Sequence, residues 1–219
     1  MSVSDNLLKI KSSLPGQVTL VAVSKTKPIR LINEAYEAGH RDFGENYVQE
    51  LAQKQAELPR DIRWHFIGHL QSNKVKYIAP FVHLIHGVES LKLLKEINKQ
   101  ALRNQRTIDV LLQLHIAMEE TKFGLSFDEC RELLSGTGLT QLFGVRVRGL
   151  MAMASNTSDK EKIREEFLSV KRFHESVKDR PACFDILSYG MSGDYQIAVE
   201  CGSTMVRVGS AIFGERQYN

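Results

Sequence analysis

The sequence has few cysteines and no long apolar segment. Its 219 residues include only three cysteines, Cys130, Cys183 and Cys201, which are far apart and show no metal-binding or redox spacing. A sparse and odd number of cysteines favours buried free thiols in a reducing compartment. No segment has the apolar length needed to cross a bilayer, and the first residues lack the apolar core of a signal peptide. We therefore expect a cytoplasmic protein that does not bind a membrane.

Charge of one sign is also lacking. The 29 Lys and Arg residues nearly balance the 26 Asp and Glu residues, the formal net charge is +3, and the two signs are interleaved. Such a mild positive charge argues against a nucleic-acid partner. The sequence contains no linker, low-complexity tract or exact internal repeat, so a single domain over residues 1–219 is expected.

The sequence does contain a regular alternation of strand-like and helix-like segments. Short apolar and β-branched runs are followed by segments whose apolar residues recur at helical spacing. The expected strands are 18–25, 41–46, 63–70, 83–90, 107–117, 144–154, 183–190 and 204–214. The expected helices are 29–39, 47–58, 73–80, 91–105, 126–136, 158–179 and 194–202. Ser90 and the pair Ser126 and Glu129 are expected to cap two of them.

This alternation predicts an α/β fold. Strands separated by helices favour a parallel sheet, and eight such units form a (β/α)8 barrel, for which a length of roughly 200 residues is the lower range. The alternative is an open doubly wound sheet, but the pattern G-x-G-x-x-G does not follow the first strand. We predict one TIM-type barrel, with an extra N-terminal helix at 2–13 that covers the bottom of the barrel.

A lysine ends the first expected strand, in VTLVAVSKTKP (18–28). Val21, Val23 and Lys25 share one face, so valines that fill the barrel would place Lys25 at its mouth, where these barrels carry their chemistry. Apolar surroundings and a nearby Arg207 would lower the pKa of Lys25, and a neutral amine forms Schiff bases with carbonyl compounds. Taken alone, the position is better explained by a solvated lysine at a strand end. Lys27, one step into the loop, is expected to be solvated.

Two Gly/Ser-rich turns follow the last two strands, in SYGMSGD (188–194) and VGSAIFG (208–214). Such a turn before a helix presents backbone N–H groups to an anion, and the phosphate pocket of this barrel forms after these two strands. Either turn alone is ordinary turn chemistry. The pair favours a phosphate cradle made of Ser192, Gly193, Gly209 and Ser210.

A Schiff-base lysine together with a phosphate cradle predicts a phosphorylated aldehyde as the ligand. Pyridoxal 5'-phosphate (PLP) is the first candidate, and a sugar phosphate held by a Schiff-base aldolase is the alternative. Arg207 shares a strand face with Met205 and Gly209, so it can reach the barrel mouth. Because arginine stays protonated, it would keep the pyridine nitrogen unprotonated and make the cofactor a weak electron sink.

Six segments carry a resemblance to a known family. LVAVSKTKP, DFGENYVQE, WHFIGHLQSNK, RGLMAMA, GMSGD and STMVRVGSAIFG resemble, in order and spacing, the YggS/PROSC-type pyridoxal phosphate homeostasis proteins over nearly the whole chain. The resemblance implies a fold like the N-terminal barrel of alanine racemase, an internal aldimine on Lys25, and Arg207 facing the ring nitrogen. The expected cofactor-binding residues are Lys25, Asn46, Met153, Ser188, Ser192, Arg207, Gly209 and Ser210.

What the resemblance implies about activity is mostly negative. The family is regarded as a carrier or buffer of PLP that influences vitamin B6 and amino-acid or keto-acid balance. Racemases of this type take a second acid/base from an added β-domain of a partner chain, and this sequence ends at Asn219 without one. Robust catalysis is therefore not expected, and a low-activity PLP-dependent amino-acid racemase is the alternative. The expected partners are PLP and PLP-dependent apo-enzymes, and the expected oligomeric state is a monomer.

One departure and one set of histidines complete the expectations. Where the family usually has methionine after the serine that closes the seventh strand, this chain has Tyr189, which is expected to pack near the ring or the phosphate. His65, His69, His83 and His86 lack a third metal ligand nearby. No metal site is predicted, and all four histidines are expected in packing or surface positions.

Overall fold

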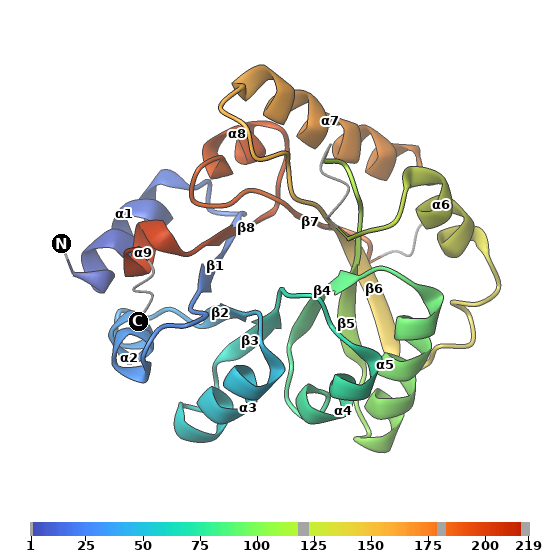
Figure 1. The fold of residues 1–219 in the computed structure, drawn as a ribbon, viewed down its shortest axis with the longest axis horizontal. Coiled ribbons are helices and arrows are strands. Elements are labelled where there is room, and N and C mark those ends of the chain that lie inside the picture. The colour runs from blue at the N-terminus through green and yellow to red at the C-terminus, as the bar shows by residue number, and fades with distance from the viewer. Residues whose placement is uncertain (1, 118–122, 179–182, 216–219) are drawn as a thin grey trace.

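The eight predicted strands close into one parallel barrel (Figure 1). The computed structural model describes residues 2–117, 123–178 and 183–215. Each strand pairs in parallel with the next along the chain, and the last pairs with the first. The strands are β1 Thr19–Val23, β2 Asp42–Glu45, β3 Arg63–Phe66, β4 Leu84–Val88, β5 Ile108–Gln113, β6 Val145–Met151, β7 Ile186–Ser188 and β8 Met205–Val208. The predicted barrel is confirmed, and the open doubly wound sheet is excluded.

The helices form a ring around the barrel, as Figure 1 shows. Each buries one face against the strands; in α7 the buried residues Ile163, Phe167, Val170 and Phe173 recur at helical spacing. After α1 come α2 Ile29–Glu37, α3 Val48–Glu57, the 3-10 helix η1 Ser72–Lys74, α4 Val75–Ile78, α5 Leu91–Arg103, α6 Phe127–Ser135, α7 Lys160–Ser176, α8 Tyr195–Glu200 and α9 Ser210–Phe213. The predicted caps are confirmed: Ser90 caps α5, and Ser126 forms a capping box with Glu129 at α6.

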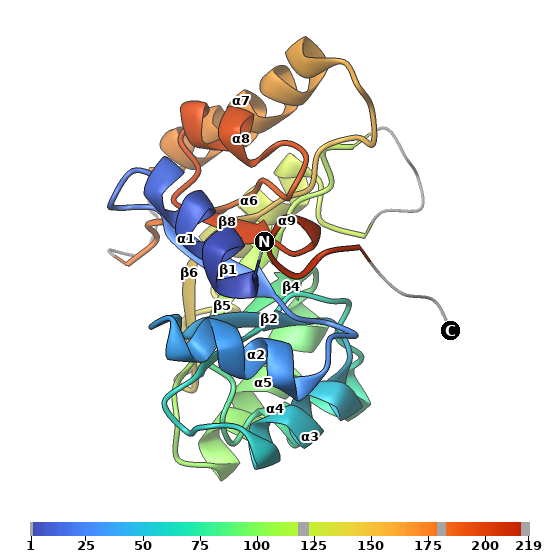
Figure 2. The same ribbon diagram turned by 90° about the vertical axis from the view of Figure 1, so that its left-hand side faces the viewer.

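The N-terminal helix α1 (Val3–Ser13) lies beside the barrel, so the prediction that it covers the bottom was wrong. It contacts α2 and α9, and Asn6 Nδ2 donates to the carbonyl of Ile212 at 3.1 Å. Figure 2 shows α1 in front of β1 and β8. The helix after β8 has only 4 residues, which leaves the outer side of these two strands uncovered. The apolar face of α1, formed by Val3, Leu7 and Ile10, covers it.

Side chains alternate between the barrel interior and the helical ring. Phe43, Trp64 and Phe66 point outward into the main core, whereas Leu84 and Met205 belong to a separate cluster inside the barrel. Every second residue of β2, β3, β4, β7 and β8 likewise faces inward. Several of these inward residues are polar and buried: Asp42, His65, His86, Ser188 and Arg207. The interior is therefore a packed core that is partly apolar and partly hydrogen-bonded.

All eight strands end earlier than predicted. The expected strand 63–70 stops at Phe66, 107–117 at Gln113 and 183–190 at Ser188. The residues beyond these ends form loops at the C-terminal end of the barrel, and many remain buried there. Apolar character extended past the last ladder hydrogen bonds, which is why the sequence pattern overestimated the strands.

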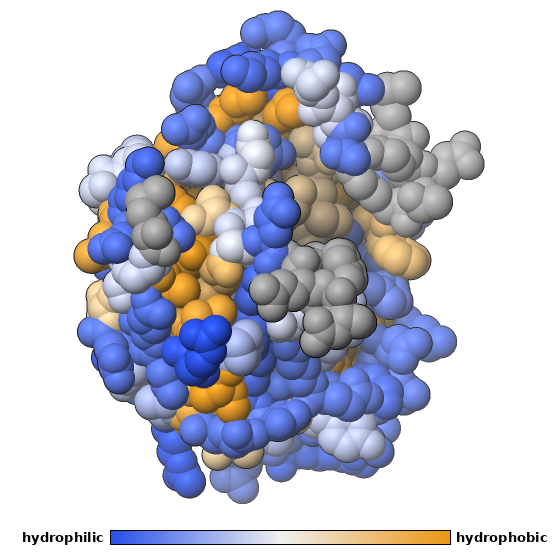
Figure 3. All heavy atoms as spheres, turned by 60° about the vertical axis from the view of Figure 1, so that its left-hand side comes forward, coloured by the Kyte–Doolittle hydropathy of each residue, from blue (hydrophilic) through white to orange (hydrophobic). Residues whose placement is uncertain are grey.

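The surface and the cysteines of the described residues bear on membrane association and on disulfides. On the face drawn in Figure 3, hydrophilic side chains predominate and smaller groups of hydrophobic ones lie between them. Within the described residues, no helix combines the length and apolar character needed to span a membrane. Cys130 and Cys201 are buried and Cys183 is half-buried, and all three are free, as predicted for the thiols.

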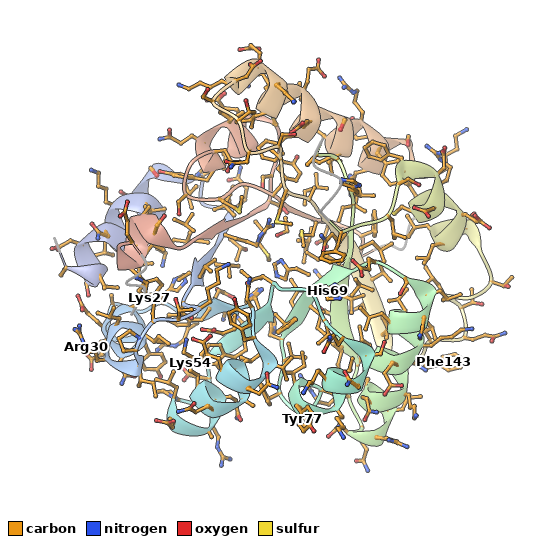
Figure 4. The ribbon with its side chains drawn as sticks, viewed as in Figure 1. Lys27, Arg30, Lys54, His69, Tyr77 and Phe143 are labelled. Carbon is orange, nitrogen blue, oxygen red and sulfur yellow. The ribbon has the colours of Figure 1, made fainter. Side chains whose placement is uncertain are left out.

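The interface between α7 and the strands should carry much of the stability. Phe167 is fully buried and stacks on Tyr189, with ring centroids 4.9 Å apart. Phe167→Ala is expected to lower the free energy of unfolding by about 3–5 kcal/mol, because it leaves a cavity in the core. Phe143, which is 79% exposed and labelled in Figure 4, is the matched control. Phe143→Ala should change the urea-unfolding energy by less than about 0.5 kcal/mol; equal losses would contradict this packing.

Candidate cofactor site

A cavity of about 340 Å³ opens at the C-terminal ends of the strands. Its volume falls within the range of roughly 300–1,000 Å³ typical of small-molecule sites. The lining residues are Val23, Lys25, Lys27, Asn46, Ile67, Met153, Met191, Ser192, Gly193, Arg207, Gly209, Ser210 and Gly214. All the predicted cofactor-binding residues except Ser188 are among them. The structure thus brings together residues from both ends of the chain, and their role as cofactor contacts stays a prediction.

Lys25 lies in a tight turn directly after β1. The N–H of Lys27 donates to the carbonyl of Ser24 at 3.0 Å, which closes the turn around Lys25. The residue after Lys25 is Thr26, whose φ is 63°. A β-branched residue rarely adopts a positive φ, so the backbone beside Lys25 is strained and needs support from its surroundings.

Lys54 of α3 supplies that support. Its Nζ donates to the carbonyl of Ser24 at 2.7 Å, to Glu45 Oε1 at 2.8 Å and to Glu50 Oε1 at 2.7 Å. Glu50 Oε1 also accepts the N–H of Thr26 at 2.6 Å. We call Lys54, Glu45 and Glu50 the Lys54 clamp. It holds both residues that flank Lys25, and Figure 4 labels Lys54 beside α3.

Lys54 and Glu45 of the Lys54 clamp are buried, whereas Glu50 is partly exposed. Lys54 is only 5% exposed and Glu45 is fully buried. Burial raises the pKa of Glu45, and the ammonium of Lys54 opposes this shift. Sequence reasoning missed the clamp, although a signal was present. Lys54 follows Val48 and Leu51 on the apolar face of α3, where a lysine requires a carboxylate partner.

Lys27, which was expected to be solvated, is partly exposed and also hydrogen-bonded through its ammonium. It is half-buried, and its Nζ donates to the carbonyls of Gly214 at 2.9 Å and Glu215 at 2.8 Å. Figure 4 shows Lys27 near α9, the helix that these carbonyls follow. The lysine therefore ties the segment after α9 to the turn after β1, and it adds a positive charge to the cavity wall.

The two predicted phosphate turns meet at Ser192. Its Oγ accepts the N–H of Gly209 at 3.2 Å and that of Ala211 at 3.5 Å. A Cβ on Gly209 would lie 3.3 Å from the Cβ and the carbonyl oxygen of Val23, so glycine suits the close approach of this turn to β1. Backbone N–H groups that converge on a serine oxygen can equally donate to a phosphate oxygen.

Arg207 of β8 is a buried cation on the cavity wall. It is 4% exposed. Its Nη1 donates to the carbonyl of Ser188 at 2.7 Å and to Ser188 Oγ at 2.8 Å, and its Nη2 donates to the carbonyl of Ala152 at 3.1 Å. Burial lowers the pKa of Arg207 to about 10, so the guanidinium remains charged at neutral pH.

Ser188 is the last residue of β7, and Tyr189, which follows it, points the opposite way. Ser188 is fully buried behind Arg207, and its Oγ lies 3.1 Å from His86 Nδ1. It is not among the described residues that line the cavity, and its predicted role as a cofactor contact stays a prediction. Tyr189 points outward, where it stacks on Phe167 and its hydroxyl donates to the carbonyl of Cys201 at 2.9 Å. Tyr189 packs against the surrounding helices. It does not lie where the pyridine ring or the phosphate of the cofactor was expected.

The four histidines fall into two groups. His65 and His86 are buried in the barrel, and His65 Nδ1 lies 3.0 Å from His86 Nε2. His69 and His83 are exposed, and the ring of His69 stacks on Phe123 with centroids 4.4 Å apart. In the described part of the chain, no group of three His, Cys, Asp or Glu residues is placed to hold a metal ion.

Asn46 and Met153 complete the wall. Asn46 follows β2, and its Oδ1 is buried without a hydrogen-bond partner among the described residues. A buried amide of this kind favours a polar ligand group beside it. Met153 is half-buried and packs against the apolar cluster inside the barrel. Its flexible side chain gives the cavity an apolar surface.

The fold and the site together define a class: barrels of the alanine racemase type with a lysine at the mouth. The family model described as "Alanine racemase, N-terminal domain" matches residues 2–217. The "Pyridoxal phosphate homeostasis protein" of Vibrio alginolyticus is 40% identical over 210 residues, which cover 94% of this chain and 89% of the relative. The chain belongs to the family of pyridoxal phosphate homeostasis proteins.

Solved structures show the same relationship. PipY of Synechococcus elongatus, determined without PLP, has a TM-score of 0.92 and 36% identity, over 97% of this chain and 100% of that one. A second PipY structure, with PLP bound, has a TM-score of 0.88. Alanine racemase of Bartonella henselae has a TM-score of 0.74 at 16% identity, over 99% of this chain and 60% of the racemase. At that identity the likeness concerns the fold alone.

The Lys54 clamp predicts a large effect of a single substitution. Lys54→Met leaves the Glu45 carboxylate buried without its cation, so the free energy of unfolding should fall by about 3–5 kcal/mol in urea titrations. Lys95→Met, an exposed lysine of α5, is the control and should change it by less than about 0.5 kcal/mol. Similar values for the two variants would contradict a structural role for the clamp.

The burial of His86 predicts a pH dependence of stability. Burial lowers the pKa of His86 well below its usual value, and the cation of Arg207 acts in the same direction. The unfolded chain takes up this proton near pH 6.5. Stability is therefore fully present above about pH 6.5 and falls below it, by about 1.4 kcal/mol per pH unit from this group.

Urea unfolding between pH 7.5 and 5.5 measures this slope. His86→Gln should reduce it by about that amount, whereas His69→Gln, at an exposed site, should keep the wild-type slope. An unchanged slope in His86→Gln would show that His86 titrates equally in both states.

Proposed function

We propose that this protein binds PLP in the cavity at the barrel mouth and serves in PLP homeostasis. The observation that carries the proposal is that an amine, a buried guanidinium and two N–H-rich turns line one cavity: Lys25, Arg207 and the turns at Ser192 and Gly209. The names of relatives at 36–40% identity and the PLP bound to PipY support the same ligand.

The residues present fit the functional groups of PLP one by one. Lys25 offers an amine to the aldehyde, with release of water when the covalent carbon–nitrogen bond forms. The N–H groups around Ser192 suit the phosphate, and Lys27 adds a positive charge on the same wall. Asn46 offers its unpaired amide oxygen to a polar substituent of the ring.

Arg207 would face the pyridine nitrogen. Its three hydrogen bonds to Ser188 and Ala152 use both Nη1 hydrogens and one Nη2 hydrogen. Nε and the other Nη2 hydrogen have no partner among the described residues and remain available to the ligand. PLP supplies an electron sink to enzymes that protonate its ring nitrogen. A permanent cation at that position opposes protonation, which favours holding the cofactor over catalysis.

The setting in which the protein works follows from the same proposal. We infer a cytoplasmic, monomeric, single-domain carrier over residues 1–219, which takes up PLP and passes it to PLP-dependent apo-enzymes. Through that supply it would influence vitamin B6 and amino-acid or keto-acid levels. The names of the relatives, which refer to homeostasis and not to a reaction, support this role.

The absorption spectrum tests the binding proposal. Protein mixed with PLP should turn yellow, and borohydride should bleach the colour and fix the ligand to the peptide that contains Lys25. Lys25→Ala should abolish both effects, whereas Lys27→Ala should weaken binding but leave the modification on Lys25. A colourless wild-type protein would refute the proposal. Borohydride trapping of a sugar phosphate in preference to PLP would favour the aldolase alternative.

Exchange of the α-hydrogen of amino acids with deuterium distinguishes a carrier from a weak racemase. With PLP-loaded protein, we expect no exchange above that of free PLP at the same concentration. Exchange that is faster than free PLP and is lost in Lys25→Ala would support the low-activity racemase instead.

A further inference from the structure

A continuous chain of polar side chains runs through the barrel behind Arg207. Ser188 Oγ lies 2.8 Å from Arg207 Nη1 and 3.1 Å from His86 Nδ1. His86 Nε2 lies 3.0 Å from His65 Nδ1, and His65 Nε2 lies 3.1 Å from Asp42 Oδ1. All five residues are buried. They come from β8, β7, β4, β3 and β2, so the chain crosses the interior from the mouth to the lower end of the barrel.

The chemistry of its two ends fixes the direction of every hydrogen bond. Arg207 can only donate, so Ser188 Oγ accepts from it and has its own hydrogen free to donate to His86 Nδ1. His86 must then have its proton on Nε2, where it donates to His65 Nδ1. His65 in turn has its proton on Nε2 and donates to the carboxylate of Asp42. Two neutral histidines with the same tautomer satisfy all four bonds.

The charges at the two ends favour this direction. Each donor hydrogen points from the cation of Arg207 toward the anion of Asp42, so the bond dipoles are aligned with the field between the two charges. Asp42 is held as an anion by Arg63, whose Nε donates at 2.7 Å and whose Nη2 donates at 2.5 Å. Although burial raises the pKa of Asp42, the hydrogen bonds from Arg63 and His65 lower it well below its usual range.

The arrangement with a protonated His65 leaves a buried donor without an acceptor. A proton added to His65 would make both its nitrogens donors, so that His86 would donate from Nδ1 to Ser188 Oγ. The hydroxyl hydrogen of Ser188 would then face the N–H groups of Arg207, and the structure gives Ser188 Oγ no other partner within the described residues. Leaving a buried donor unsatisfied is unfavourable. The neutral arrangement is therefore the stable one.

We propose that Ser188, His86 and His65 form a positioning relay that orients the Arg207 guanidinium at the cavity and couples it to Asp42. None of the three lines the cavity, so they act on a bound ligand only through Arg207. The identity of that ligand rests on the proposed function, whereas the relay itself exists without it. The relay explains why polar side chains occupy part of an interior that could have been apolar.

Nitrogen-15 NMR of histidine-labelled protein without added PLP tests the relay directly. At pH 7.5, His65 and His86 should both be neutral with the proton on Nε2. In Ser188→Ala the Nδ1 signal of His86 should shift, because its donor is lost. Ser203→Ala removes another buried hydroxyl, one that bonds only to backbone carbonyls, and should leave that signal in place. The spectrum of the wild-type protein is sufficient to refute the relay. A cationic His65 or His86, or a proton on Nδ1 of either, would overturn the proposal.

The second measurement is the affinity for PLP, read from the absorption titration. Ser188→Ala should weaken binding by about tenfold, the effect of losing one hydrogen bond to a charged group, while Lys25 is still modified. Ser203→Ala should bind like the wild type. Equal affinities for the two variants would overturn the role of the relay in positioning Arg207. A wild-type protein that does not bind PLP would refute the proposed function, and the NMR result would still decide the relay.

Discussion

The buried charge of Arg207 is the constraint on which the rest of the site depends. A guanidinium that is 4% exposed remains in the barrel only if buried acceptors replace its water, and Ser188 and Ala152 supply them. Ser188 ends β7 and Ala152 follows β6, so these acceptors come into place when the barrel closes. Arg207 also pairs in register with Val21 of β1, the strand that leads to Lys25. Closure of the sheet therefore sets the geometry of the cavity mouth.

Two lysines near β1 illustrate how burial assigns different chemistry to the same residue type. Lys54 is surrounded by Glu45, Glu50 and a carbonyl, which fix its ammonium as a structural cation. Lys25 lies on the other side of the same turn and lines the cavity. Thr26, the next residue in the turn, has a strained positive φ. Tertiary contacts therefore hold Lys25 in place, and local backbone preference does not.

The sequence predicted what depends on local pattern and strand order. Alternation of strands and helices gave the barrel, and parity along β1 and β8 placed Lys25 and Arg207 at one mouth. Contacts between distant elements were not accessible in this way. The Lys54 clamp joins residues 9 and 30 positions apart, and the bond from Ser188 to His86 spans 102 positions. Tyr189 and α1 were misplaced for the same reason, because the partner surfaces on α7, α2 and α9 were unknown.

The protonation state of bound PLP tests the central claim most directly. The hydrogen bonds from Arg207 to Ser188 and Ala152 hold a cation on the cavity wall, where we propose that it faces the ring nitrogen. The nitrogen-15 chemical shift of ring-labelled PLP bound to the wild-type protein reports that state. We expect an unprotonated pyridine nitrogen across the neutral pH range, because the pKa of Arg207 is about 10. A protonated nitrogen at pH 7 would contradict the assignment of Arg207 to the ring and the carrier function derived from it.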